Sequence, residues 1–241
     1  MNSSIVTNTK NSSKDALLKV ESPIKYSIGT LVNDFHMYSV MKESFYNSGF
    51  TENHCEFLFI NNSQENTHDA YRGLNIIISN SQGKYILLCH QDVLTIDTKL
   101  ILDERLSELD KIDGNWAIAG NAGFNDKMER FIRISDPHMN NAKQGDLPAK
   151  VLCLDENFLV IRKDALIGFS RDLHGFHFYG TDIVLQAKIR GFNSYVIDFH
   201  LHHLSGGKID KKYWESAIEF EKKYLKAIKP LKKATWNDIK V

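Results

Sequence analysis

The alternation of strand-like and helix-like segments through the first half of the chain limits the folds that it can adopt. Helical patterns over 34–48, 67–79 and 98–111 separate extended, β-rich runs, which lie at 26–32, 56–60, 84–89 and 116–120. The run at 84–89 is almost continuously apolar, as expected for a strand buried on both faces of a sheet. This order is typical of βαβ units, so we predict an α/β fold whose central sheet is mostly parallel and flanked by helices.

The second half of the chain has weaker patterns. Residues 121–149 form a polar stretch rich in Asn, Asp and Gly, which we interpret as a long functional or mobile loop. After it we predict short strands at 151–154 and 158–161, a helix at 182–190 that ends before Gly191, and a strand at 194–199.

Length, charge and cysteine content exclude several classes of protein. The 241 residues suit one large or two small domains, and 30 basic residues balance 30 acidic ones. This balance gives no chain-wide attraction for nucleic acid, and we predict no such partner. Cys55, Cys89 and Cys153 are odd in number and lie in or beside apolar stretches, which favours buried thiols in a reducing, cytoplasmic compartment.

The two ends of the chain differ in character from its middle. Residues 1–23 are rich in polar residues and lack the apolar core of a secretion signal, so we predict a flexible tail. Residues 208–241 carry ten Lys against five acidic residues. Apolar residues recur there at helical spacing, namely Trp214, Ala217, Ile218, Tyr224, Leu225 and Ile228.

We therefore predict a basic, amphipathic C-terminal helix in residues 208–241. One interpretation is that this helix packs on the body of the protein with a solvated basic face. The other is a peripheral contact with an acidic partner or with an anionic membrane, at its inner face. An exposed apolar stripe would also permit a dimer, so the oligomeric state stays open.

A polar triplet, His90-Gln91-Asp92, follows the apolar run at 84–89. Ligands of open α/β sheets bind beyond the carboxyl ends of the strands, which is where this triplet falls. His90 and Asp92 can turn to the same side if the chain stays extended. An imidazole and a carboxylate suit Mn²⁺ or Mg²⁺ bridged by phosphates, whereas the alternative is a polar strand end with a capped turn.

Two further groups of residues carry chemistry. Asp182 follows Gly180 and Thr181 after the aromatic run 176–179, and it either stabilises the start of a helix or acts as a general base on a hydroxyl. His200, His202 and His203 follow the last predicted strand. His200 and His202 point to one face of an extended chain and His203 to the other, so all three cannot bind one ion without a bend. The alternatives for these histidines are a structural role and a metal or phosphate contact by at least one of them.

Taken in order, these segments resemble the inverting family 2 glycosyltransferases of the GT-A fold. Residues 81–88 followed by His90-Gln91-Asp92 are similar to the stretch that leads into the metal-binding DxD motif, with His90 in place of the first Asp. The resemblance covers about residues 24–207. It continues through 26–33 and 56–63, similar to the first two strands and the base-binding loop, and through 179–185 and 190–203, similar to the Gly-Glu-Asp helix start and the closing strand with its histidine.

The resemblance implies a GT-A domain at 24–207, with a nucleotide-binding half to about residue 120 and an acceptor-binding half after it. It implies that Asp182 is the catalytic base, and that Asp92 binds a divalent metal with help from His90 and either His202 or His203. The nucleotide-sugar site would comprise Thr30, Val32, Asn33, Asn61, Asn75, His90, Gln91 and Asp92. The acceptor-side candidates are Glu156, His177, Tyr179 and Thr181.

The activity implied is hexosyl transfer with inversion from a UDP-linked sugar to a glycan, glycoprotein or lipid-linked acceptor, in the assembly of bacterial surface polysaccharide. The HQD variant is most similar to the glycosyltransferase-like branch of the family. Asn61 stands where the family usually has an Asp that contacts uracil. Two alternatives are a non-catalytic nucleotide-sugar or glycan-binding module on the same fold, and a nucleotidyltransferase.

Overall fold

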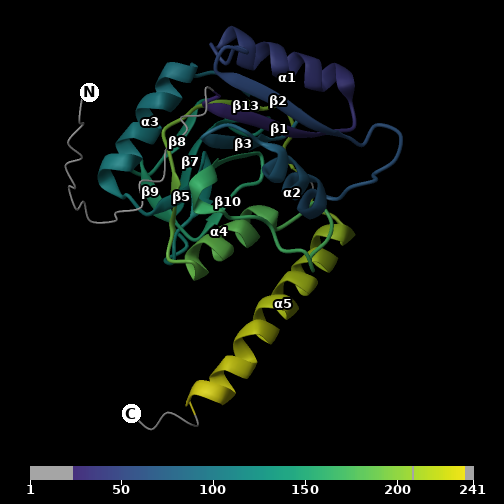
Figure 1. Cartoon of the computed structure of the whole chain (residues 1–241), viewed down its shortest axis with the longest axis vertical. Helices are drawn as coiled ribbons and strands as arrows, with labels where there is room; N and C mark the ends of the chain where they lie inside the picture. Colours follow the sequence, from purple (N-terminus) through teal and green to yellow (C-terminus); the bar gives the residue numbers. More distant parts are fainter. Residues whose placement is uncertain (1–23, 208, 237–241) are drawn as a thin grey trace, which may run out of the picture.

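A seven-stranded sheet forms the centre of the molecule, and helices cover both of its faces (Figure 1). The computed structural model describes residues 24–207 and 209–236. The strand order is β2-β1-β3-β11-β5-β12-β9. Its strands are β1 (Tyr26–Val32), β2 (Cys55–Asn61), β3 (Tyr85–Cys89), β5 (Trp116–Gly120), β9 (Ala149–Val151), β11 (Phe158–Arg162) and β12 (Asn193–Val196).

The pairing in this sheet is mixed. β1 is parallel to β2 and β3, and β12 is parallel to β5. β11 runs antiparallel between β3 and β5, and β9 is antiparallel to β12. The predicted α/β fold is confirmed, but this sheet is not mostly parallel, because only three of its six strand pairs are parallel.

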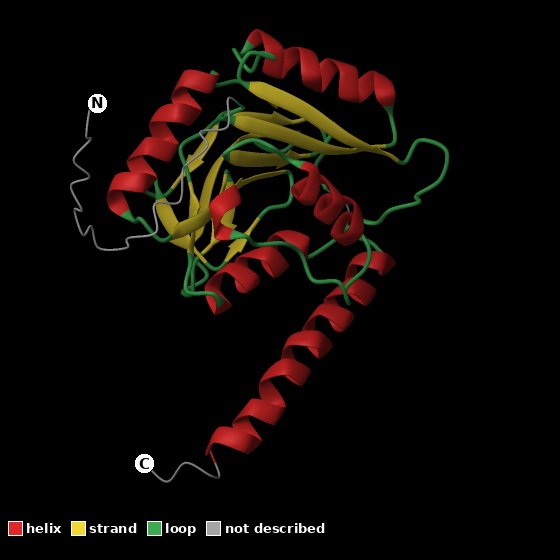
Figure 2. Cartoon of the chain, viewed as in Figure 1, coloured by secondary structure: helices red, strands yellow, loops and turns green. Residues whose placement is uncertain are grey.

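Helices lie on both faces of the sheet (Figure 2). α1 (Phe35–Asn47) and α3 (Lys99–Ile112) cover one face, and α2 (Ala70–Asn80) and α4 (Tyr179–Ile189) cover the other. The carboxylate of Asp34 accepts hydrogen bonds from two backbone N–H groups at the start of α1, and Asp69 does the same for one N–H of α2. Such side-chain caps stabilise a helix start by about 1 kcal/mol each.

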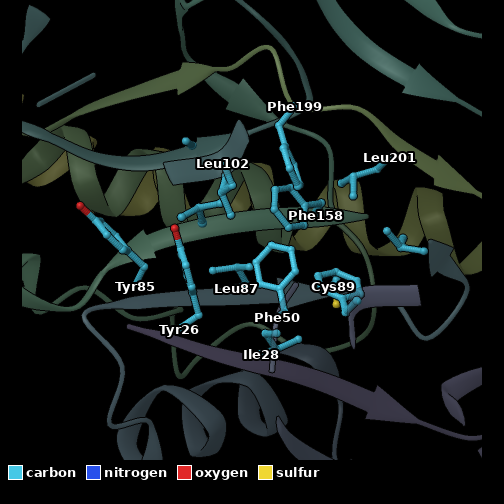
Figure 3. Close-up of a cluster of buried hydrophobic side chains, with 14 of the residues drawn as sticks. Tyr26, Ile28, Phe50, Tyr85, Leu87, Cys89, Leu102, Phe158, Phe199 and Leu201 are labelled. Atoms are coloured by element: carbon cyan, nitrogen blue, oxygen red, sulfur yellow. The ribbon is translucent and has the colours of Figure 1, made fainter. Parts of the chain in front are cut away.

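The sheet separates two apolar clusters. Figure 3 shows the cluster under α1 and α3, where Tyr26, Leu87 and Phe158 of neighbouring strands meet Phe50 and Leu102. A second cluster lies under α2 and α4. Each fully buried side chain of this size contributes about 1.5–3 kcal/mol relative to its exposed state. This packing fixes the strand ends on which the candidate site is built.

A second sheet lies beside the first, with the order β10-β6-β7-β13-β4 and with β8 paired to β7. Its strands are β4 (Val93–Thr95), β6 (Ala122–Phe124), β7 (Arg130–Ser135), β8 (Ala142–Gln144), β10 (Cys153–Leu154) and β13 (Leu201–His203). The prediction of a single loop at 121–149 is therefore wrong. Four of these strands have three residues and β10 has two, which is too few to show an alternating pattern; in β7 the half-buried Arg133 separates the buried Ile132 and Ile134.

Most other predicted segments agree with the structure within a few residues, but the strand predicted at 151–154 is divided between β9 and β10, which belong to different sheets, and β4 and β13 have no predicted counterpart. One further difference bears on function. α4 begins at Tyr179 rather than at 182, after a residue in the left-handed conformation, Phe178. A 3₁₀ turn, η1 (Lys163–Ala165), follows β11. No helix in the described ranges is long and apolar enough to cross a bilayer.

The C-terminal segment contains the predicted helix, α5 (Lys211–Trp236), which extends away from the body (Figure 1). Its first turns pack against the protein, because the rings of Tyr213 and Phe220 contact the ring of Phe178. Trp214 is 61% exposed, and it shares an outward-facing stripe with Ile218 and Leu225. The predicted tail at 1–23 lies outside the described residues.

Candidate active site

The carboxyl ends of β1 and β3 open into a cavity of about 320 Å³, which we call the strand-end pocket. Parallel neighbours end at the same edge of a sheet, so the residues that follow β1 and β3 meet there. Its lining comprises Leu31, Asn33, Asn62, Asn66, Leu74, Leu88, Cys89, His90, Gln91, Asp92, Glu156, Phe176 and Tyr179.

A larger cavity of about 720 Å³, the loop pocket, lies beside it. The second sheet, the segments before β11 and α4, and the start of α5 form its walls. His90, Glu156 and Phe176 line both cavities, so the two are contiguous. The lining of the loop pocket also includes Phe124, Asp136, Asp155, His177, Phe178, Thr181, His203 and Tyr213.

His90, Asp92 and His203 form a cluster where the two pockets meet. β13 pairs with β4 so that His203 lies opposite Val93, the residue after Asp92. His203 Nε2 is 3.4 Å from His90 Nδ1 and 3.4 Å from Asp92 Oδ1. One ligand atom from each of the three residues lies within 4.8 Å of the others. Two imidazoles and a carboxylate in this arrangement can hold a divalent cation.

The structure also shows which of His202 and His203 belongs to the cluster, a choice that the sequence did not determine. His203 belongs to the cluster, whereas His202 lies outside it and pairs in register with Leu94 and Ser135 on the neighbouring strands. Consecutive side chains of a strand point to opposite faces, so only one of the two can face the pocket. The expectation of a ligand at His202 is therefore not supported by the geometry.

A hydrogen-bond chain orients His90. Tyr179 O–H donates to the backbone oxygen of Glu156 at 3.0 Å, and His90 Nε2 lies 2.7 Å from the same hydroxyl oxygen. The hydroxyl has a single hydrogen, so Nε2–H of His90 is the donor in the second bond. The lone pair of the neutral ring is then on Nδ1, the nitrogen that faces His203. Such a second contact commonly fixes the tautomer of a metal-binding histidine.

The charges in the cluster suit metal binding. Burial raises the pKa of Asp92, but hydrogen bonds from His203 and Ser205 outweigh it and lower that pKa to about 2. Burial and the neighbouring His203 both lower the pKa of His90. The cluster therefore offers an ionised carboxylate and a neutral imidazole near neutral pH.

Four of the residues expected to bind the nucleotide-sugar line the strand-end pocket, namely Asn33, His90, Gln91 and Asp92. Gln91 Oε1 accepts hydrogen bonds from the backbone N–H groups of Asn33 and Asp34 at 2.9 and 3.0 Å, which ties the end of β3 to the end of β1. Both Thr30 and Val32 are fully buried within β1 instead, so they support the pocket from behind.

Asn61 and Asn75 lie outside both pockets. Asn61 Oδ1 accepts hydrogen bonds from the N–H and the hydroxyl of Ser63, and Asn75 bonds the backbone of Phe169 through both ends of its amide. Asn62 lines the strand-end pocket in place of Asn61. Asn62 could not be identified from the sequence, because it lies in a run of three polar residues, 61–63, with no pattern that shows which one faces the pocket.

All four acceptor-side candidates lie at the pockets. Glu156 lines both, Tyr179 lines the strand-end pocket, and His177 and Thr181 line the loop pocket. Sequence reasoning missed Tyr213, because its place in the wall depends on how α5 packs on the body.

Asp182, expected as the catalytic base, is fully buried and lines neither pocket. Its carboxylate accepts hydrogen bonds from the N–H and hydroxyl of Ser170, at 2.8 and 2.6 Å, and from the hydroxyl of Tyr224. These bonds join α4 to the segment before it and to α5. The geometry thus gives Asp182 a structural role.

Solved structures of GT-A glycosyltransferases share this architecture. TarS from S. aureus in complex with UDP-GlcNAc superposes with a TM-score of 0.53 and 12% identity, covering 81% of this chain and 66% of that one. Mannosyltransferase PcManGT from Pyrobaculum calidifontis, in complex with GDP-Man and Mn²⁺, has a TM-score of 0.51 and 10% identity, covering 74% of this chain and 56% of that one. The chain thus has the GT-A fold and spans less than two thirds of these proteins.

No protein-family model matches the chain. A protein of Fuscovulum blasticum described as ATP synthase subunits region ORF 6 is 33% identical to it over 213 residues, covering 86% of each chain. Identity at this level over most of both chains shows common family membership. The chain therefore belongs to the same family as the ATP synthase subunits region ORF 6 protein of Fuscovulum blasticum.

Proposed function

We propose that this protein is a glycosyltransferase that moves a sugar from a nucleotide-sugar, UDP-linked by preference, to a hydroxyl of a glycan, glycoprotein or lipid-linked acceptor. The observation that carries the proposal is the cluster of His90, Asp92 and His203 at the carboxyl end of β3, between two contiguous pockets of a GT-A fold. Inversion at the anomeric carbon is part of the proposal and rests on the resemblance to family 2 enzymes.

The residues of the cluster fit a divalent cation, Mn²⁺ or Mg²⁺. Asp92 is ionised, His90 directs its lone pair toward His203, and the three ligand atoms are close enough to share an ion. Similar PcManGT was solved with GDP-Man and Mn²⁺. When bound, such an ion supplies positive charge that stabilises a departing diphosphate. The two imidazoles favour Mn²⁺ over Mg²⁺, which prefers oxygen ligands.

The two pockets differ in ways that suit two substrates. The strand-end pocket presents amide groups of Asn33 and Gln91 near the cluster, and we place the nucleotide there. The loop pocket combines aromatic rings with the carboxylates of Asp136 and Asp155, and we place the acceptor there. Flat apolar faces beside hydrogen-bond acceptors suit a neutral sugar, which carries both apolar C–H faces and hydroxyl donors. The acceptor is thus expected to be an uncharged sugar unit.

The proposal is tested with the full chain and a donor panel of UDP-GlcNAc, UDP-glucose, UDP-galactose and GDP-mannose, with and without Mn²⁺. We expect release of nucleoside diphosphate from one donor, dependent on metal and lost in Asp92→Ala. Hydrolysis of the donor reports this release before the acceptor is known. Release of pyrophosphate would instead indicate a nucleotidyltransferase, and binding without any release would indicate a non-catalytic module.

A further inference from the structure

A general base for glycosyl transfer must touch the acceptor hydroxyl, and Asp182 cannot do so from its place in the interior. Its carboxylate is fully buried, and its hydrogen-bond partners, Ser170 and Tyr224, line neither pocket. The base must therefore be sought among the carboxylates that line the pockets.

Four carboxylates in the described part of the chain line these pockets. Asp92 belongs to the metal cluster. Asp136 Oδ1 accepts hydrogen bonds from the backbone N–H groups of His138 and Met139, and Asp155 Oδ1 accepts one from the N–H of Asn157 at 2.9 Å. These two carboxylates hold local turns and line the loop pocket alone.

Glu156 is the fourth, and among the described residues it is the one carboxylate that lines both pockets. It thus lies where an acceptor in the loop pocket would meet a donor in the strand-end pocket. A base must contact the attacking hydroxyl next to the anomeric carbon, so a place at this junction is the geometric requirement for the role.

The start of α4 holds Glu156 in place. Gly180 N–H donates to Glu156 Oε1 at 3.4 Å, so the carboxylate lies at the positive end of the helix. A Cβ at position 180 would come within 3.1 Å of Glu156 Cγ and 2.4 Å of the backbone oxygen of Leu154. Glycine at this position lets the Glu156 side chain lie against the helix start.

We propose that Glu156 is the general base of the transfer, an inference that rests on the proposed function. The acceptor hydroxyl gives its proton to the Glu156 carboxylate, and its oxygen forms a bond to the anomeric carbon. The bond from that carbon to the diphosphate oxygen breaks, and its electron pair leaves with the nucleoside diphosphate. One bond forms as another breaks, and the proton ends on Glu156.

The protonation behaviour of Glu156 is compatible with this role. Burial raises the pKa of Glu156 to about 8, and the charge of Asp155 adds to the rise, whereas the N–H groups at the start of α4 oppose it. A general base is most efficient when its pKa lies near the working pH. A carboxylate that served only as a helix cap in water would keep a low pKa.

Glu156→Gln in the full chain separates the two roles that the geometry allows. The Gln side chain keeps a carbonyl oxygen that can accept the hydrogen bond from Gly180, so the cap is retained, but it cannot take a proton. We expect nucleoside diphosphate release to fall by about 100-fold or more, a typical contribution of a general base. The melting temperature and the dissociation constant for the donor, measured by calorimetry, should stay unchanged.

Asp182→Asn is the matched control. The NH₂ group of an Asn side chain cannot accept a hydrogen bond, so at least one of the donors on Ser170 and Tyr224 would lose its partner. We therefore expect a melting temperature lower by roughly 4–8 °C. Release per folded molecule should stay within about threefold of wild type. The assignment would be overturned if Glu156→Gln released nucleoside diphosphate at the wild-type rate. It would also be overturned if Asp182→Asn folded and bound the donor but no longer released nucleoside diphosphate. A wild-type chain that releases no nucleoside diphosphate from any donor would instead overturn the proposed function, and the assignment with it.

Discussion

The strand-end pocket and the loop pocket adjoin, yet the chain builds them in different ways. Strand ends of the main sheet supply much of the first, including Leu31, Asn33 and the triplet after β3. The second combines short strands, two loops and Tyr213 of α5, which are far apart in the sequence. The strand-end pocket is thus formed mainly by the regular central sheet, whereas the loop pocket is formed by short strands and loops from distant parts of the chain. We expect the first to govern donor binding and the second to govern the choice of acceptor, with the candidate metal cluster where the two pockets meet.

The largest expected effect in this comparison concerns His203 and its neighbour. His203→Ala removes one of the three candidate ligands and should weaken Mn²⁺ binding by at least about 100-fold, since loss of a supporting contact alone costs about 10–100-fold. His202→Ala removes a similar side chain that lies outside the cluster, and should leave binding within about threefold. Titration calorimetry with Mn²⁺ measures both variants.

Equal losses in the two variants would show that β13 is held in another register, and would remove the basis for separating the histidines. Unchanged Mn²⁺ binding in His203→Ala would place the ion elsewhere.

The next effect concerns the hydroxyl of Tyr179, which fixes the ring of His90. Tyr179→Phe keeps the buried ring but removes the hydroxyl, so His90 loses the partner of Nε2–H. We expect Mn²⁺ affinity to fall by about tenfold, at the lower end of the range for a contact that supports a ligand. Calorimetry of the variant measures this change.

Tyr71→Phe serves as the control for this effect. The Tyr71 hydroxyl also lies near the start of α4, but it donates to the backbone oxygen of His177 at 2.9 Å and has no bond to His90. A similar loss of affinity in both variants would mean that packing at the start of α4, rather than the tautomer of His90, sets the affinity.

Much of the strand-end pocket could be predicted because its signals are local. An apolar run of strand length followed by His90-Gln91-Asp92 places polar groups at the edge of a sheet, whatever the rest of the chain does. The choice of His203 over His202 as a member of the cluster could not be predicted from the sequence. Adjacent positions differ in the face they occupy, and the choice between them depends on the pairing of β13 with β4.

The exchange of roles between Asp182 and Glu156 has a similar cause. The sequence placed the start of α4 at residue 182, which would have left Asp182 at the open end of the helix. The helix begins three residues earlier, at Tyr179, and Asp182 then points into the interior. The side chain at the start of α4 is instead Glu156, which comes from the segment between β10 and β11. This contact joins distant parts of the sequence, so no local pattern predicts it.

The smallest effect tests whether the loop pocket selects the acceptor. The ring of Tyr213 lines this pocket and lies 4.9 Å from the ring of Phe178, measured between centroids. Tyr213→Ala removes an aromatic face on which a sugar could pack, so we expect the acceptor KM to rise about fivefold, close to 1 kcal/mol, with the donor KM unchanged. Trp214→Ala removes the neighbouring ring on α5, which is 61% exposed and does not line the pocket, and should alter neither constant. Steady-state kinetics with the acceptor sugar identified from a panel of methyl glycosides gives both values. A rise in the donor KM for Tyr213→Ala would mean that α5 affects the strand-end pocket as well. The assignment of the donor and the acceptor to separate pockets would then be wrong.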